Sequence, residues 1–138
     1  MAKIRVLQAC NQLGIGGTEK TIQVFSKYLD RSRFEVFACG LGAGGPRADE
    51  LAKLGVTVIV KPPDLDALIR DLQIDIYHVY RAGDYEPGTL PRKHDGRPKI
   101  VETNVFDAID PAENSLIDAH VFFSEWCRQD YLSKYCRF

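Results

Sequence analysis

The sequence has few cysteines, little net charge and no long apolar run, and each shortage excludes a class of protein. None of its four cysteines forms a Cys-x-x-Cys pair, which argues against zinc-ribbon and thioredoxin-like proteins. A formal net charge of -1 lacks the basic excess of a general nucleic-acid binder. No segment approaches the roughly 18 consecutive apolar residues of a membrane span, and the N-terminus lacks a secretory apolar region. We therefore expect a cytoplasmic protein with free thiols, no nucleic-acid partner and no transmembrane segment.

What the chain does contain is a regular alternation of elements. Its 138 residues, 45% of them hydrophobic, suffice for one domain with a hydrophobic core. Strand-like runs rich in Val, Ile and Phe recur at Ile4–Cys10, Phe34–Gly40, Val56–Val60, Ile74–Tyr80, Lys99–Asn104 and Ala119–Ser124. Nearly continuous apolar runs are typical of strands buried on both faces, and helical patterns lie between them. The order predicts an α/β fold, a Rossmann-like doubly wound parallel sheet of about six strands with helices on both faces.

Local signals predict where the helices begin and end. Asp64 and Ser124 can each cap the start of a helix, and Gly55 can end one. Pro111 suits the first turn of a short helix over about residues 111–118.

The connection Arg81–Pro98 contains too many glycines and prolines for a helix. We expect a long surface loop at the carboxyl edge of the sheet, where such folds place ligands. His94 stands in its basic part, which is either a solvated turn or a peripheral contact for an anionic acceptor or a lipid head group.

Several polar or reactive residues fall on the strands themselves. We expect His78 to be a buried, hydrogen-bonded histidine and His120 to be structural. Glu102 would need a partner if it points inward. Cys10 and Cys39 are expected as buried free thiols.

A glycine-rich segment, Gly14-Ile15-Gly16-Gly17, joins the first strand to the first helix. Glycines lack the Cβ that would block a close approach, and a helix N-terminus attracts anions, so the segment predicts a phosphate-type site. The dinucleotide fingerprint fails because Glu19 stands where a glycine is required, and a P-loop fails because Glu19-Lys20-Thr21 lacks its glycine. A tight turn without a ligand is the alternative.

Three segments carry a family resemblance through their order and spacing. The first is Gly16-Gly17-Thr18-Glu19 before a helix, followed by Arg33-Phe34-Glu35-Val36. The second is Asp75-Ile76-Tyr77-His78-Val79-Tyr80-Arg81, and the third is Ala119-His120-Val121-Phe122-Phe123-Ser124 before a helix. Together they span nearly the whole chain and resemble the N-terminal half of GT-B glycosyltransferases of the large retaining family 4.

The resemblance implies the acceptor-side domain of an enzyme that moves a sugar from a nucleotide-diphosphate sugar to the hydroxyl of a sugar or lipid-linked acceptor, with retention. It implies no cofactor and no metal. It places Gly16 and Gly17, with Thr18 and Lys20 as helpers, beside the donor diphosphate and the acceptor.

Strand ends supply further candidates for binding phosphate or sugar hydroxyls, namely Arg81, Asn104 and Asp107. For Arg81 a surface ion pair with Asp84 or Glu86 is an equal alternative. No catalytic residue is assigned.

The chain also departs from the family. Val105 stands where many members carry a histidine that contacts the donor sugar, and the paired glutamates of the C-terminal, donor-binding domain have no counterpart. We therefore expect residues 1–138 to be a single N-terminal domain cut from a longer protein and inactive alone. A non-catalytic nucleotide- or sugar-phosphate-binding module is the alternative. A dinucleotide-dependent oxidoreductase is disfavoured, because Gly40 ends the second strand where an acidic ribose ligand is expected.

Overall fold

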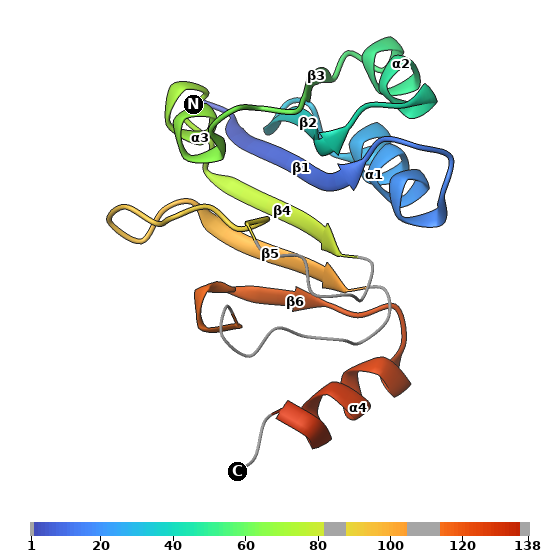
Figure 1. Ribbon diagram of the computed structural model, residues 1–138, viewed down its shortest axis with the longest axis vertical. Helices are drawn as coiled ribbons and strands as arrows, with labels where there is room; N and C mark the ends of the chain where they lie inside the picture. The colour runs from blue at the N-terminus through green and yellow to red at the C-terminus, as the bar shows by residue number, and fades with distance from the viewer. Residues whose placement is uncertain (1, 82–87, 105–113, 136–138) are drawn as a thin grey trace.

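The computed structural model describes residues 2–81, 88–104 and 114–135. In chain order the elements are β1 (Ile4–Gln12), α1 (Gly17–Tyr28), β2 (Phe34–Ala43), α2 (Pro46–Lys53), β3 (Thr57–Val60), α3 (Leu65–Asp71), β4 (Ile76–Arg81), β5 (Lys99–Asn104), the 3-10 helix η1 (Asn114–Leu116), β6 (Ala119–Val121) and α4 (Glu125–Tyr135). The strands form one sheet in the order β3-β2-β1-β4-β5-β6, and every neighbouring pair is parallel (Figure 1). The Rossmann-like doubly wound fold predicted from the sequence is confirmed.

Two hydrophobic clusters lie on opposite faces of this sheet. Leu7 of β1 packs in one cluster with Ile69 of α3. Cys10 of β1 packs in the other cluster, with Ile22 of α1 and Leu51 of α2. Successive side chains of a strand point to opposite faces, so residues three apart on β1 serve different cores. Helices therefore cover both faces, as the near-continuous apolar runs predicted (Figure 1).

Three of the predicted helix boundaries are confirmed. The Asp64 side chain accepts a hydrogen bond from the Ala67 amide at 3.0 Å and caps α3. The Ser124 hydroxyl accepts one from the Cys127 amide at 3.1 Å and caps α4. Gly55 lies just past α2 with a φ of 80°, a left-handed conformation that favours glycine.

The prediction for the connection after β4 needs a correction. Its described part, from Gly88 onward, runs to the amino edge of the sheet rather than staying at the carboxyl edge (Figure 1). Because β4 and β5 are parallel, the chain must travel back along the sheet before β5 can start. The Arg97 guanidinium accordingly lies 3.0 Å from the carboxylate of Asp75, just before β4. His94 therefore stands at the edge opposite the glycine-rich loop.

The segment before β6 also differs from its prediction. Of the helix expected over residues 111–118, the described part holds only η1, a single 3-10 turn. Pro111 lies outside the described residues.

Candidate functional site

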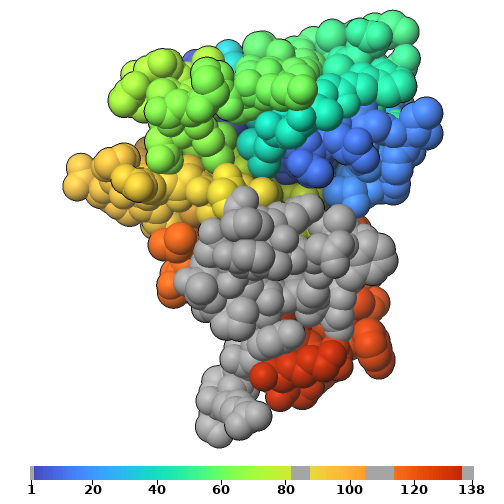
Figure 2. Space-filling model, viewed as in Figure 1, coloured from blue at the N-terminus to red at the C-terminus, as the bar shows by residue number. Residues whose placement is uncertain are grey.

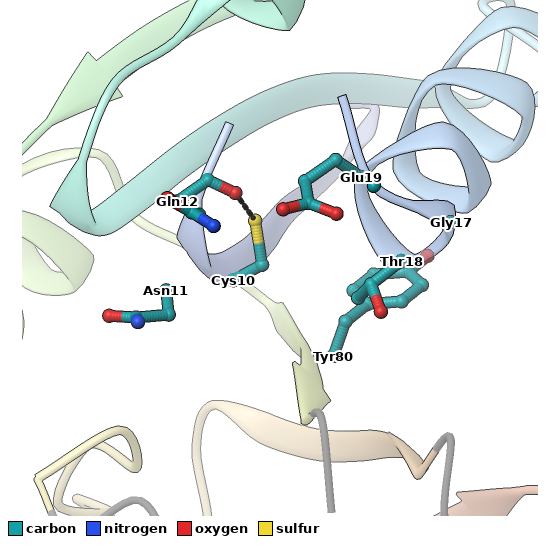
Figure 3. A pocket seen from close by; sticks show the side chains of 8 residues that line it. Cys10, Asn11, Gln12, Gly17, Thr18, Glu19 and Tyr80 are labelled. Atoms are coloured by element: carbon teal, nitrogen blue, oxygen red, sulfur yellow. Dashed lines mark hydrogen bonds between the residues drawn. The ribbon is translucent and has the colours of Figure 1, made fainter. Parts of the chain in front are cut away.

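A cavity of about 210 Å³ lies at the carboxyl edge of the sheet, between the end of β1 and the first turn of α1 (Figure 3). Its walls come from β1, the glycine-rich loop, α1 and β4: Cys10, Asn11, Gln12, Gly16, Gly17, Thr18, Glu19 and Tyr80. Between β1 and β4 the strand order reverses direction. Doubly wound sheets bind ligands in the crevice at this switch point. The cavity thus occupies the place where the fold itself favours a ligand.

The first turn of α1 offers backbone donors to this cavity. Gly16 caps the helix without a side chain, and the first intrahelical bond runs from the Lys20 amide to the Gly16 carbonyl at 3.1 Å. The amides of Gly17, Thr18 and Glu19 precede that bond and have no acceptor within the helix. Apart from its two chain neighbours and the backbone of its own helix, no atom of the described residues lies within 4 Å of a Cβ built at Gly17. The turn can therefore approach an anion closely with its N–H groups.

Glu19 gives the same cavity a negative side. Glu19 is only 8% exposed, and its carboxylate points between the glycine-rich loop and the end of β1 (Figure 3). A Cβ built at Gly16 would lie 2.6 Å from Glu19 Oε2, so the carboxylate lies against the loop. In the described part of the chain no group donates a hydrogen bond to it. The helix N-terminus stabilises this charge, while an anion next to Gly16 would be repelled.

Arg47 of α2 holds the glycine-rich loop in its conformation. Its Nε donates to the Gly14 carbonyl at 3.2 Å, and one terminal nitrogen donates to the Ile15 carbonyl at 3.1 Å. The other terminal nitrogen donates to the side-chain oxygen of Gln23 on α1. One planar guanidinium thus ties two carbonyls of the loop to two helices.

A network of buried polar side chains positions Tyr80, whose ring forms a wall of the cavity. The Tyr80 hydroxyl donates to Gln8 Oε1 at 2.7 Å, and its ring stacks on His78 with centroids 4.3 Å apart. His78 Nε2 lies 2.7 Å from the hydroxyl oxygen of Thr103. Burial lowers the pKa of His78 to about 4 and raises the pKa of Tyr80, so both are neutral at pH 7. The prediction of a buried, hydrogen-bonded histidine is confirmed.

The structure brings together only part of the predicted site. The members that line the cavity are Gly16, Gly17 and Thr18. Lys20 is exposed on α1 and does not line it. Arg81 and Asn104 are buried at the ends of β4 and β5, also outside its lining. Asp107 lies outside the described residues.

Arg81 forms a buried ion pair with Glu102 of β5. Arg81 Nε lies 3.3 Å from Glu102 Oε2, and the two side chains are 5% and 1% exposed. This burial differs from the surface ion pair considered from the sequence, and Asp84 and Glu86 lie outside the described residues. Glu102 has the partner that an inward carboxylate requires, and its Oε1 is also 3.2 Å from His120 Nδ1. The pair ties β4, β5 and β6 together.

Arg47 and five lining residues were not assigned to the site from the sequence; the five are Cys10, Asn11, Gln12, Glu19 and Tyr80. Asn11 and Gln12 directly follow the first apolar run, so their place at the end of a parallel strand was a usable signal. Glu19 was noted from the sequence as the residue that breaks two phosphate motifs and as the last residue of the Gly16-Gly17-Thr18-Glu19 segment, but it was given no role in the site. Arg47 carried no local signal, because it lies 33 residues from Gly14.

Comparison with known proteins adds no relative, since no protein-family model, curated protein or solved structure matches this chain. Within the described ranges, no group of three or more His, Cys, Asp and Glu side chains is arranged to hold a metal ion. No helix among the same residues is both long and apolar enough to cross a membrane. The functional inference therefore depends on the cavity at the switch point and on the groups that line it.

Proposed function

We propose that this chain is the acceptor-side, N-terminal domain of a retaining glycosyltransferase, and that its cavity takes part of a nucleotide-diphosphate sugar. One observation carries the proposal: the same cavity joins helix-terminal amides with a buried carboxylate. The amides of Gly17 and Thr18 suit a phosphate oxygen. The Glu19 carboxylate suits a hydroxyl group, because an ionised carboxylate only accepts hydrogen bonds. A sugar diphosphate presents both kinds of group next to each other.

The mixed lining also disfavours simpler ligands. A bare diphosphate would bring its negative charges towards Glu19, where the helix N-terminus offsets part of the repulsion. Asn11 and Gln12 provide side-chain amides that can both donate to and accept from hydroxyls. We place the diphosphate towards Gly17 and the sugar hydroxyls towards Glu19.

The size of the cavity supports a shared site. About 210 Å³ is below the roughly 300–1,000 Å³ of pockets that enclose a whole small ligand. The proposal therefore includes a second domain that covers the rest of the donor and completes the reaction. In that reaction the bond from the sugar carbon to the diphosphate breaks, the acceptor oxygen bonds to the same carbon, and the proton of the acceptor hydroxyl passes to the departing diphosphate. Helix-terminal amides would stabilise the charge that develops on the leaving diphosphate.

Titration of the chain with UDP-glucose, GDP-mannose and the bare nucleoside diphosphates, followed by amide NMR shifts, tests the proposal. Gly17→Val should weaken binding by at least about tenfold, because it blocks the amides without disturbing the fold. Val24→Ala, on the same helix but outside the cavity, should leave binding unchanged.

The variant Glu19→Gln tests where the sugar and the diphosphate lie in the cavity. It should weaken the binding of the nucleotide sugar and tighten that of the nucleoside diphosphate, because it removes an acceptor for hydroxyls and a repulsive charge together. A change of the same sign for both ligands would contradict the placement. NADH binding as tightly as the nucleotide sugars would contradict the proposed function. Binding without sugar transfer by the longer protein would favour the non-catalytic module, for which Val105 is the sequence argument.

A further inference from the structure

A second cavity, of about 400 Å³, lies at the amino edge of the sheet, opposite the proposed donor site. It is lined by α3 and the two residues Gln73 and Ile74 after it, and by residues 92–98, and these segments lie side by side at the left of the view in Figure 2. Its floor is apolar: Ile69 and Ile74 are 7% and 5% exposed, and Pro98 is buried. The rim is basic and carries Arg70, Arg92, His94 and Arg97.

A tight hairpin holds one side of this rim. His94 and Arg97 exchange backbone hydrogen bonds of 2.7 and 3.1 Å. Between them Asp95 and Gly96 have φ values of 54° and 73°, as the central residues of a type I′ turn do. Paired residues of this kind project their side chains from the same side of the ribbon. The side chains of His94 and Arg97 therefore leave the hairpin on the same side.

The guanidinium groups of the rim keep donors for a ligand. The Arg92 side chain has no acidic partner among the described residues. Arg70 Nε is 3.3 Å from a carboxylate oxygen of its neighbour in sequence, and both side chains are at least 70% exposed. The Arg97 side chain, which pairs with the Asp75 carboxylate just before β4, is 71% exposed. Exposed pairs of this type contribute little, so an incoming anion can compete for these groups.

Basic side chains outnumber acidic ones in the lining of this cavity, although the whole chain has a net charge of -1. The lining holds three arginines and one carboxylate, that of Asp66, and the carboxylates of Asp71 and Asp75 pair with Arg70 and Arg97 from outside it. Asp66 Oδ1 already accepts a hydrogen bond from the Arg92 backbone amide at 2.7 Å. Forked guanidinium groups recognise phosphate through paired hydrogen bonds, and an apolar floor takes a hydrocarbon body.

We propose that this cavity binds a phosphate monoester whose body is apolar. The phosphate would lie between Arg92 and Arg97, and the body would lie over Ile69 and Ile74. The proposal does not depend on the glycosyltransferase function, because it concerns the other edge of the sheet.

Titration with phenyl phosphate, inorganic phosphate and benzyl alcohol, followed by amide NMR, separates the two halves of the recognition. Phenyl phosphate should bind at least about tenfold more tightly than either half alone, with shifts over residues 66–74 and 91–98. Arg92→Gln and Arg97→Gln should each weaken it by about tenfold. Arg128→Gln, which removes an exposed arginine paired on α4, should change nothing. Equal affinity for phenyl and inorganic phosphate, or wild-type affinity in both rim variants, would overturn the proposal.

A vesicle arm distinguishes the sources of such an ester. Sedimentation with phosphatidylcholine vesicles that contain phosphatidic acid, but not with phosphatidylcholine alone, would identify a lipid head group, provided that phenyl phosphate competes. Binding of phenyl phosphate without sedimentation would identify a soluble ester. Sedimentation that the rim substitutions leave intact would contradict a role for this cavity in membrane binding.

Discussion

Replacing His78 should remove much of the acid sensitivity of the fold. The imidazole is buried between Tyr80 and Thr103, and burial lowers its pKa from 6.5 to about 4. His78→Gln removes the titrating group and keeps an amide near the position of Nε2, where it can bond to Thr103.

The direction of the change in stability with pH depends on whether the folded or the unfolded chain binds the proton at the higher pH. Above pH 6.5 the imidazole of His78 is neutral in both states, and its contribution to stability is complete. As the pH falls from 6.5 towards 4, the unfolded chain takes up a proton that the folded chain refuses, so the free energy of unfolding falls. A difference of about 2.5 pH units, at about 1.4 kcal/mol per unit, corresponds to about 3.5 kcal/mol in full, of which about 3 kcal/mol is lost by pH 4.

Urea unfolding followed by circular dichroism between about pH 7.5 and pH 4 measures this loss. The wild type should lose about 3 kcal/mol over the range, and His78→Gln should lose much less. His94→Gln, which removes an exposed histidine, should retain the wild-type slope. The hydrogen bonds of Asp118 to Lys93 and of Glu125 to Arg128 lower the pKa of each carboxyl, and their contribution to the pH slope is the same in the wild type and in His78→Gln. An identical pH slope in His78→Gln and the wild type would refute the reasoning.

The remaining predictions concern the loop and the thiols. Gly17→Ala should raise the free energy of unfolding by about 0.5 kcal/mol, whereas Gly40→Ala should lower it by more than about 2 kcal/mol, because its Cβ would lie 2.1 Å from a backbone oxygen. Urea unfolding compares the two, and equal effects would contradict the packing of β2. Arg47→Gln should speed amide exchange over residues 14–18 and cost about 1–2 kcal/mol, and unchanged exchange would contradict the clamp. Burial raises the pKa of Cys39 to about 12, so Cys127 should react with a disulfide reagent long before Cys39, as mass spectrometry of the labelled peptides can show.

The elements of the fold could be predicted because their signals are local. Apolar runs, capping residues such as Asp64 and the glycine after α2 act within a few residues of themselves. The doubly wound arrangement then follows from the alternation of strands and helices. The glycine-rich loop could likewise be placed at the carboxyl edge of the sheet.

The membership of the site could be predicted only in part. Arg81 and Asn104 end neighbouring strands, as the sequence indicates, yet both side chains are buried outside the lining of the cavity. A strand position specifies the edge of the sheet but not the direction in which a side chain finds its partner. Glu102, which binds Arg81, lies on another strand.

The sequence by itself determined which segments become strands and helices, and that a glycine-rich turn leads from β1 into α1. The tertiary structure decided the character of the site, since the burial of Glu19 beside Gly16 and the clamp from Arg47 depend on packing between α1, α2 and the ends of β1 and β4. It also decided that the basic hairpin lies at the other edge of the sheet, because a parallel sheet requires the chain to return there before β5. The physical reason is range: backbone propensity and hydrophobic period act over neighbouring residues, whereas charge and cavity shape depend on groups that only folding brings together.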